Sequence, residues 1–132
     1  MKSNALKRNE MLKSNIQIDL LFKSGVRLSK HPLKIILLPI YDSEEQYPCS
    51  LIVMASAKKY KKAVVRNRIK RLLKEIYRNN KALFYPYLTE NNKKCLLGIM
   101  YNGNEIPTFD EVEKSMISLL KRIPEMHEKY NK

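Results

Sequence analysis

Residues 58–78 constrain the fold most, because this stretch is strongly basic and also has apolar residues at regular intervals. It holds ten basic residues against one acid, Glu75, and so carries +9 of the net charge of +13. The basic residues are Lys58, Lys59, Lys61, Lys62, Arg66, Arg68, Lys70, Arg71, Lys74 and Arg78. Apolar residues recur every three or four positions, which predicts a helix over Ala63–Asn80.

The predicted helix has two opposed faces. At 100° per residue its apolar side chains fall within about 100° of arc, which indicates a core-facing stripe. The stripe consists of Val65, Ile69, Leu72, Leu73 and Ile76. The opposite side, over about 140°, is basic apart from one amide; it consists of Arg66, Asn67, Lys70, Arg71, Lys74 and Arg78, with Arg68 and Glu75 on its flank.

A charged helix face is usually only a solvated surface. Solvated faces normally mix the two signs, because opposite charges four residues apart stabilise a helix. Here Arg66, Lys70 and Lys74 follow one another at steps of four and repel each other. We therefore predict a polyanionic partner, with nucleic acid favoured over an anionic membrane surface.

Composition limits the other possibilities. A length of 132 residues suits one domain, and 44% hydrophobic residues allow a modest core. Cys49 and Cys95 form no CxxC motif and are expected to be small buried residues, not a disulfide or zinc site. Residues 1–15 lack the apolar core of a secretory signal, and no apolar run reaches the roughly 18–20 residues of a membrane span. We expect a cytoplasmic protein that binds no membrane.

The remaining pattern predicts an α+β fold. Asn15 is expected to cap a helix over residues 16–23, and Gly25 to end it. Strands are expected over residues 33–41, 49–56 and 95–101, with a weaker signal near 26–29. A turn is expected over 42–48, a break at Pro86 and another over 89–94. Thr108 is expected to cap a last amphipathic helix, which Pro124 stops.

This order of elements predicts an α/β sandwich of about four strands and three helices. The domain is expected to span residues 15–124, between a basic N-terminal tail at 1–14 and a C-terminal tail at 125–132. Tyr60 and Tyr77 flank the basic helix and are expected to pack inside the protein, with stacking on a base as the alternative.

No catalytic arrangement is visible in the sequence. Asp110, Glu111 and Glu113 begin the last helix, where negative charge is favourable. His31 and His127 are isolated and have no Ser or Cys partner. We expect a binding protein with no catalytic residues and with no metal or cofactor bound by the protein alone.

One string in this region resembles a known family. The string is Lys58-Lys59-x3-Ala63-Val64-Val65-Arg66-Asn67-Arg68-Ile69-Lys70-Arg71-Leu72. It is similar to the RNR signature of the protein subunit of bacterial ribonuclease P. Leu12, Phe22 and Gly25 resemble the first-helix pattern of that family, and the resemblance covers most of the chain.

The resemblance implies a role and a fold. In that family a catalytic RNA removes the 5′ leader of precursor tRNA, and the small protein binds both RNAs. The implied activity is that of an endoribonuclease whose RNA subunit carries catalysis, with Mg²⁺ in the RNA–protein complex. The implied partners are the catalytic RNA and precursor tRNA, and not DNA. The implied fold is ribosomal-S5-domain-2-like, with a left-handed strand–helix–strand crossover where a right-handed one is usual.

The charge pattern and the resemblance together predict an RNA-binding set, and the resemblance implies a leader cleft. The RNA-binding set is Lys58, Lys59, Lys62, Arg66, Asn67, Arg68, Lys70, Arg71, Lys74 and Arg78. Phe22 matches an aromatic residue that lines the cleft, whereas Ile18 and Ile36 stand where the family often has aromatics. The family also usually has a Gly before the signature Ala, where this chain has Tyr60-Lys61-Lys62.

Two other functions fit the charge. A structural RNA-binding protein, such as a ribosomal protein of similar fold, explains the basic face but not the signature. A DNA-binding regulator ranks last, because a helix-turn-helix needs a helix just before the recognition helix.

Overall fold

A single four-stranded sheet organises the fold in our computed structural model, which describes residues 10–40 and 47–130. The strands are β1 (Val26–Lys30), β2 (Leu33–Ile40), β3 (Cys49–Ala55) and β4 (Lys94–Tyr101), in the spatial order β1-β2-β4-β3. β2 runs antiparallel to β1 and β4, and β3 runs parallel to β4. The predicted α+β sandwich is confirmed, including the short strand near residue 26.

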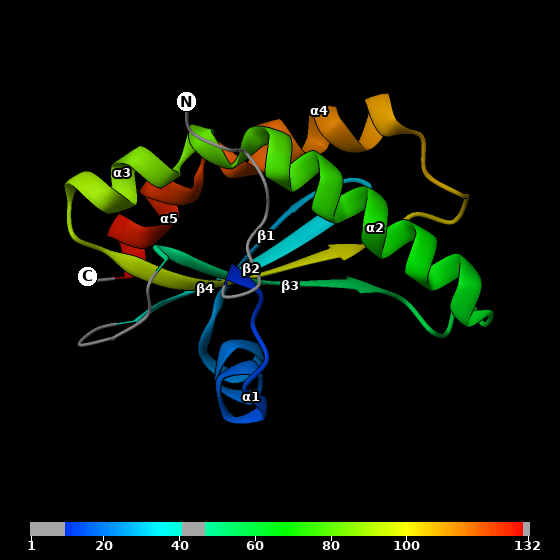
Figure 1. The fold of residues 1–132 in the computed structure, drawn as a ribbon, viewed down its shortest axis with the longest axis horizontal. Coiled ribbons are helices and arrows are strands. Elements are labelled where there is room, and N and C mark those ends of the chain that lie inside the picture. The colour runs from blue at the N-terminus through cyan, green and yellow to red at the C-terminus, as the bar shows by residue number, and fades with distance from the viewer. Residues whose placement is uncertain (1–9, 41–46, 131–132) are drawn as a thin grey trace.

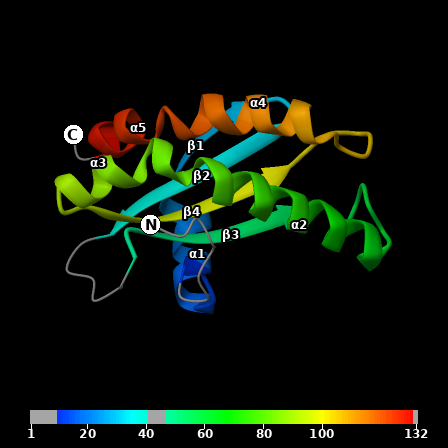
Figure 2. The same ribbon diagram turned by 45° about the horizontal axis from the view of Figure 1, so that its top comes forward.

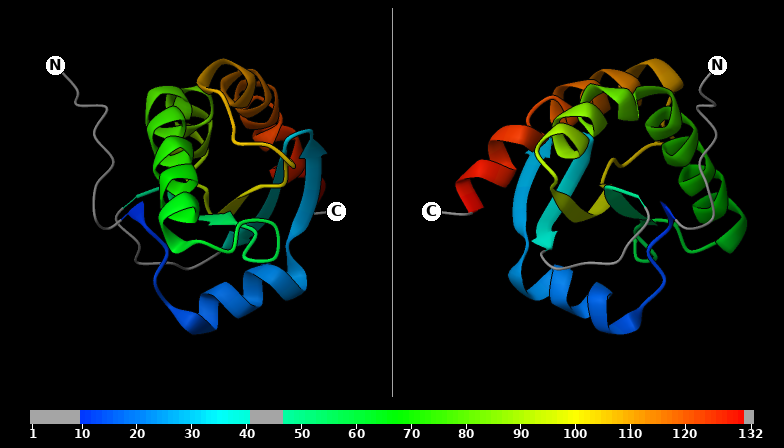
Figure 3. Two further views of the ribbon diagram at one scale, coloured as in Figure 1. Left: turned by 90° about the vertical axis from the view of Figure 1, so that its right-hand side faces the viewer. Right: turned by 60° about the vertical axis from the view of Figure 1, so that its left-hand side comes forward.

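Helices cover the two faces of this sheet unequally. α1 (Asn15–Ser24) lies alone on one face, whereas α2 (Ala63–Asn80), α3 (Tyr85–Glu90), α4 (Phe109–Leu120) and α5 (Ile123–Tyr130) lie on the other (Figures 1 and 3). A 3₁₀ turn (Lys81–Leu83) links α2 to α3. α2 and α4 run side by side across the sheet (Figure 2).

The strands supply two hydrophobic clusters because successive side chains alternate between faces. In β2, Leu33, Ile35 and Leu37 join the main core under the four helices. Ile36 and Leu38 point the other way and pack under α1 with Leu21, Leu12 and Leu96. A run that is apolar at almost every position therefore reflects a strand covered on both sides.

Helix starts follow their capping residues. Thr108 caps α4 as predicted, since its Oγ1 accepts a hydrogen bond from the Glu111 N–H at 3.4 Å. The expected cap of α1 is wrong by one residue: Ser14 is the cap, its Oγ accepting from the Gln17 N–H at 3.3 Å, and Asn15 is the first helical residue. Ser and Asn are similarly good caps, so local propensity did not separate them.

Two helices begin where only interruptions were predicted. Pro86 lies in the first turn of α3, and Pro124 is the second residue of α5. Proline disrupts a helix interior, but the first turn needs no N–H donor and tolerates it. The described residues therefore contain five α-helices instead of three.

Parts of both predicted tails pack onto the domain. Met11 forms a bridge with Leu51, and the Leu12 N–H donates to the Leu51 carbonyl at 2.7 Å, along the outer edge of β3. At the other end, Met126 and His127 are buried. The packed unit thus exceeds residues 15–124, because a free sheet edge and an apolar helix face each recruit the adjoining chain. Most of the predicted turn at 42–48 lies outside the described residues.

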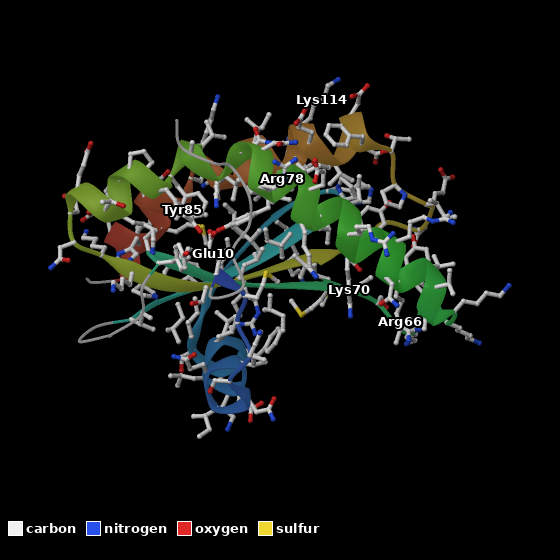
Figure 4. All side chains as sticks on the ribbon, in the orientation of Figure 1. Glu10, Arg66, Lys70, Arg78, Tyr85 and Lys114 are labelled. Atoms are coloured by element: carbon white, nitrogen blue, oxygen red, sulfur yellow. The ribbon has the colours of Figure 1, made fainter. Side chains whose placement is uncertain are left out.

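A buried carboxylate joins the start of the described chain to the helix layer. Glu10 is 1% exposed, and the Lys81 Nζ donates to both of its oxygens at 3.0 Å. The Tyr85 hydroxyl also donates to Glu10 (Figure 4). The Tyr77 hydroxyl donates to Tyr85 at 3.3 Å. Burial raises the pKa of Tyr85, so this phenol stays protonated and able to donate.

His127 is enclosed between α5 and the sheet. Its Nε2 lies 3.3 Å from the Lys94 carbonyl, and its Nδ1 has no hydrogen-bond partner among the described residues. The ring of Tyr87 lies against it, with centroids 6.5 Å apart. Burial lowers the pKa of His127 from its ordinary value of 6.5, because the charged imidazolium loses solvation there.

We expect this histidine to make stability pH-dependent. The unfolded chain takes up a proton on His127 near pH 6.5, whereas the folded protein resists it. The stabilisation is therefore complete above pH 6.5 and is lost as the pH falls below it. Denaturant unfolding at several pH values should show a weaker decline for His127→Gln than for the unsubstituted protein. Identical pH profiles would contradict the assignment.

Candidate nucleic-acid interface

α2 has the two faces that its periodicity predicts. It begins at Ala63 and ends at Asn80, so its 18 residues are about 27 Å long. Ile69, Leu73 and Ile76 are buried in the main core, and the stripe residues Val65 and Leu72 pack against it. Tyr77 is also fully buried, which contradicts the alternative that it stacks on a base.

The opposite face of α2 presents the predicted basic set to solvent. Four of its members are exposed, namely Asn67, Arg68, Arg71 and Lys74. Lys70, Arg66 and Arg78 are half-buried and lie along the helix in Figure 4. Within the described residues, Arg78 is the member that has an acidic partner, since its Nε donates to Glu75 at 3.2 Å. This bond lowers the pKa of Glu75 and partly neutralises Arg78.

Arg66 has a structural role that the helical periodicity did not predict. The cap position of α2, Lys62, makes no side-chain cap bond. Instead the Arg66 Nη1 donates to the carbonyls of Tyr60 and Lys61, both at 2.8 Å. A guanidinium has five N–H donors, so these two bonds leave others for a ligand.

The basic loop (residues 57–62) lies between β3 and α2. Lys58 and Lys62 are exposed, as a phosphate-binding role requires. Lys59 is exposed as well, but its Nζ donates to the Asn102 carbonyl at 2.8 Å. Lys59 therefore also fastens the loop to the chain that follows β4. Tyr60 is buried at 9% exposure, which excludes it as a surface stacking group in this conformation.

The predicted cleft residues share the sheet face that carries α1. Ile18 and Phe22 are partly buried against the smaller cluster, and Ile36 belongs to it. Ile36 is only 4% exposed, so it forms the floor under α1 and is not an open cleft surface. Gly25 and Gly98 make this packing possible, because a Cβ at either would lie within 3.0 Å of the Ile36 side chain.

Three further side chains on this face escaped the sequence analysis. Lys34, Met100 and Met54 are aligned across β2, β4 and β3. Lys34 is exposed, and the two methionines are half-buried. Strand alternation could have assigned them to one face, but their adjacency depends on the strand order, which the sequence did not reveal.

These surfaces carry exposed cationic side chains and partly exposed apolar ones. In the described part of the chain, no group of three or more His, Cys, Asp or Glu residues is placed to hold a metal ion. No helix there combines the length and hydrophobicity needed to cross a bilayer. Guanidinium and ammonium groups along α2 and the basic loop suit an array of phosphates.

Comparison with known proteins identifies the family. The family model described as Ribonuclease P matches residues 6–124. The chain belongs to this ribonuclease P protein family. The ribonuclease P protein component of Porphyromonas gingivalis is 32% identical over 118 residues, which cover 89% of this chain and 85% of the relative. That of Clostridium novyi is 28% identical over 117 residues, covering 89% and 96%.

Solved structures of ribonuclease P proteins share the fold. The protein from Thermotoga maritima matches with a TM-score of 0.67 at 24% identity, covering 86% of this chain and 96% of that one. The protein from Staphylococcus aureus matches with a TM-score of 0.65 at 18% identity, covering 85% and 93%. The family membership confirms the resemblance seen in the RNR signature. In addition, β3 and a loop precede α2, so α2 is not the second helix of a helix-turn-helix.

Substitutions on the two faces of α2 should separate binding from stability. Arg68→Ala removes an exposed cation and should weaken RNA binding while changing the free energy of unfolding by less than about 0.5 kcal/mol. Ile69→Ala empties a buried position and should cost about 2–5 kcal/mol. Equal shifts in melting temperature for both variants would contradict the two-face assignment.

Arg66→Ala should lower the free energy of unfolding by an amount between those of Arg68→Ala and Ile69→Ala. It deletes two hydrogen bonds from a charged donor to the basic loop, so we expect a loss of about 1–3 kcal/mol in unfolding free energy. RNA affinity should fall as well. Chemical denaturation and RNA titration of the same preparations measure both effects.

Proposed function

We propose that this ribonuclease P protein binds the catalytic RNA of ribonuclease P through α2 and the basic loop. The observation that carries the proposal is the face of α2, where Arg68, Lys70 and Lys74 have no acidic partner among the described residues. Such a face repels itself in the free protein and is relieved by phosphates. Its anchoring by a buried stripe keeps the cations in a fixed row.

The proposed division of labour leaves catalysis to the RNA. Folded RNA brings phosphates close together, and both protein cations and Mg²⁺ reduce their repulsion. A protein that supplies fixed cations should therefore lower the Mg²⁺ concentration at which the catalytic RNA is active. The Mg²⁺ that cleavage of the leader phosphodiester would require would be held in the RNA–protein complex and not by this chain alone.

We propose that the 5′ leader of precursor tRNA lies on the sheet face beside α1. Ile18 and Phe22 offer partly exposed apolar surface there, and Phe22 is the one aromatic group of the predicted cleft. Lys34 supplies a nearby cation in register with Met100. This surface favours apolar contact and charge over successive base stacking.

The purified protein should stimulate cleavage of precursor tRNA by the cognate catalytic RNA, most strongly at low Mg²⁺. Cleavage is followed by release of the labelled leader, with and without protein. A variant carrying Arg68→Ala and Lys74→Ala should stimulate less and need more Mg²⁺. A folded protein that gives no stimulation at any Mg²⁺ concentration would refute the proposal.

Phe22→Ala should weaken the contribution that the leader makes to binding of precursor tRNA. We expect a higher KM for precursor tRNA with a leader, but no change in binding of mature tRNA, because the leader alone reaches this surface. Ile16→Ala is a matched control on the same helix, since Ile16 is 82% exposed and lies outside the cluster. Equal effects of both substitutions would contradict the proposal that the leader lies on this face.

A further inference from the structure

The hydroxyl of Tyr60 fastens the basic loop from inside the protein. Its oxygen lies 2.8 Å from the carbonyl oxygens of both Gly103 and Glu105, which share its single O–H donor. These residues belong to the facing loop (residues 102–107), which leads from β4 to α4. The Tyr60 ring packs against Tyr101, with centroids 6.2 Å apart.

The facing loop is built to receive this hydroxyl. The Tyr101 hydroxyl donates to the Glu105 carbonyl at 2.7 Å, so two phenols hold the same segment. Burial raises the pKa of Tyr101 to about 12, so its hydroxyl remains a donor in mildly alkaline solution as well as at neutral pH. A Cβ at Gly103 would lie 2.3 Å from the Tyr101 hydroxyl oxygen, so the close approach requires glycine.

Other bonds restrain the two ends of the basic loop. The Tyr60 N–H donates to the Ser56 carbonyl at 2.9 Å, and the Lys59 N–H donates to the Ser56 Oγ at 3.2 Å. At the helix end, Arg66 holds the carbonyls of Tyr60 and Lys61. The backbone around Tyr60 is thus restrained through Ser56, which follows β3, through the facing loop and through α2.

The remaining lysines of the loop are free to bind a ligand. Lys58, Lys61 and Lys62 are exposed, and their ammonium groups make no hydrogen bond or ion pair with the described residues. Tyr60 lies among them in the sequence, and the loop contains no glycine. A buried anchor inside a cluster of unpaired cations points to preorganisation for an anionic partner.

We propose that Tyr60 is a positioning residue, whose hydroxyl holds the basic loop so that Lys58, Lys61 and Lys62 meet RNA phosphates in a preset arrangement. This inference rests on the proposed binding of the catalytic RNA. Ordering a loose loop at the moment of binding costs conformational entropy that a fastened loop has already lost. In this chain the basic loop contains no glycine, and the Tyr60 hydroxyl holds the loop in one conformation.

The test is Tyr60→Phe, which keeps the ring and removes the hydroxyl. Affinity for the catalytic RNA should fall about three- to tenfold, the worth of one net hydrogen bond. The plot of log affinity against log salt should become less steep by about one unit, because fewer phosphates are neutralised. A purely structural role would lower the melting temperature without changing the salt slope.

Tyr85→Phe is the matched control. It also removes a hydroxyl that donates a hydrogen bond inside the protein. This hydroxyl donates to Glu10 and lies near the far end of α2 (Figure 4). It should lower the melting temperature and leave RNA affinity and salt slope unchanged. The same loss of slope in Tyr85→Phe would assign the effect to general loosening and overturn the proposal.

A double-mutant cycle tests whether the hydroxyl acts through the lysines. In a background carrying Lys58→Gln, Lys61→Gln and Lys62→Gln, Tyr60→Phe should no longer reduce RNA affinity. An equal reduction in both backgrounds would overturn the proposal. If the unsubstituted protein binds the catalytic RNA but Tyr60→Phe binds equally well, only this inference fails. If the unsubstituted protein does not bind that RNA, the proposed function itself fails.

Discussion

The apolar character of β2 and β4 on both faces is the constraint on which the rest of the fold depends. These strands occupy the centre of the sheet, and neither face can stay in contact with water without a large cost. One face takes α2 and its neighbouring helices, and the other takes α1. Because the clusters use alternate residues of the same strands, a shift of one residue in register would exchange them.

This two-sided burial also separates the two proposed RNA surfaces. α2 turns its stripe to the main core, which leaves its basic side on the outer surface. α1 covers only part of the opposite face, so Met54, Met100 and Lys34 keep some exposure beside it. One sheet thus supports a row of cations on one side and an apolar surface with a nearby cation on the other.

Local signals predicted the strongly patterned parts of the chain well. The period of α2 predicted both of its ends, and Thr108 marked the start of α4. Pro86 and Pro124 misled the prediction, because proline interrupts one helix and starts another with equal ease. The burial of Glu10 and His127 was not predictable either, since their partners lie 71 and 33 residues away.

For the candidate site too, some features followed from the sequence and others only from the fold. The sequence by itself determined that a row of cations stands opposite an apolar stripe, because helical periodicity is a local property. The Arg78–Glu75 pair is also local, because its partners are three residues apart on one helix, but only the tertiary structure decided how the basic loop before this row is held. The structure shows that Arg66 and Lys59 bond to loop carbonyls and Arg78 to Glu75, whereas Arg68 and Lys74 are exposed without an acidic partner among the described residues. The physical reason is that the basic loop is shaped by residues 102–105, which only the folding of β3 beside β4 brings within hydrogen-bonding distance.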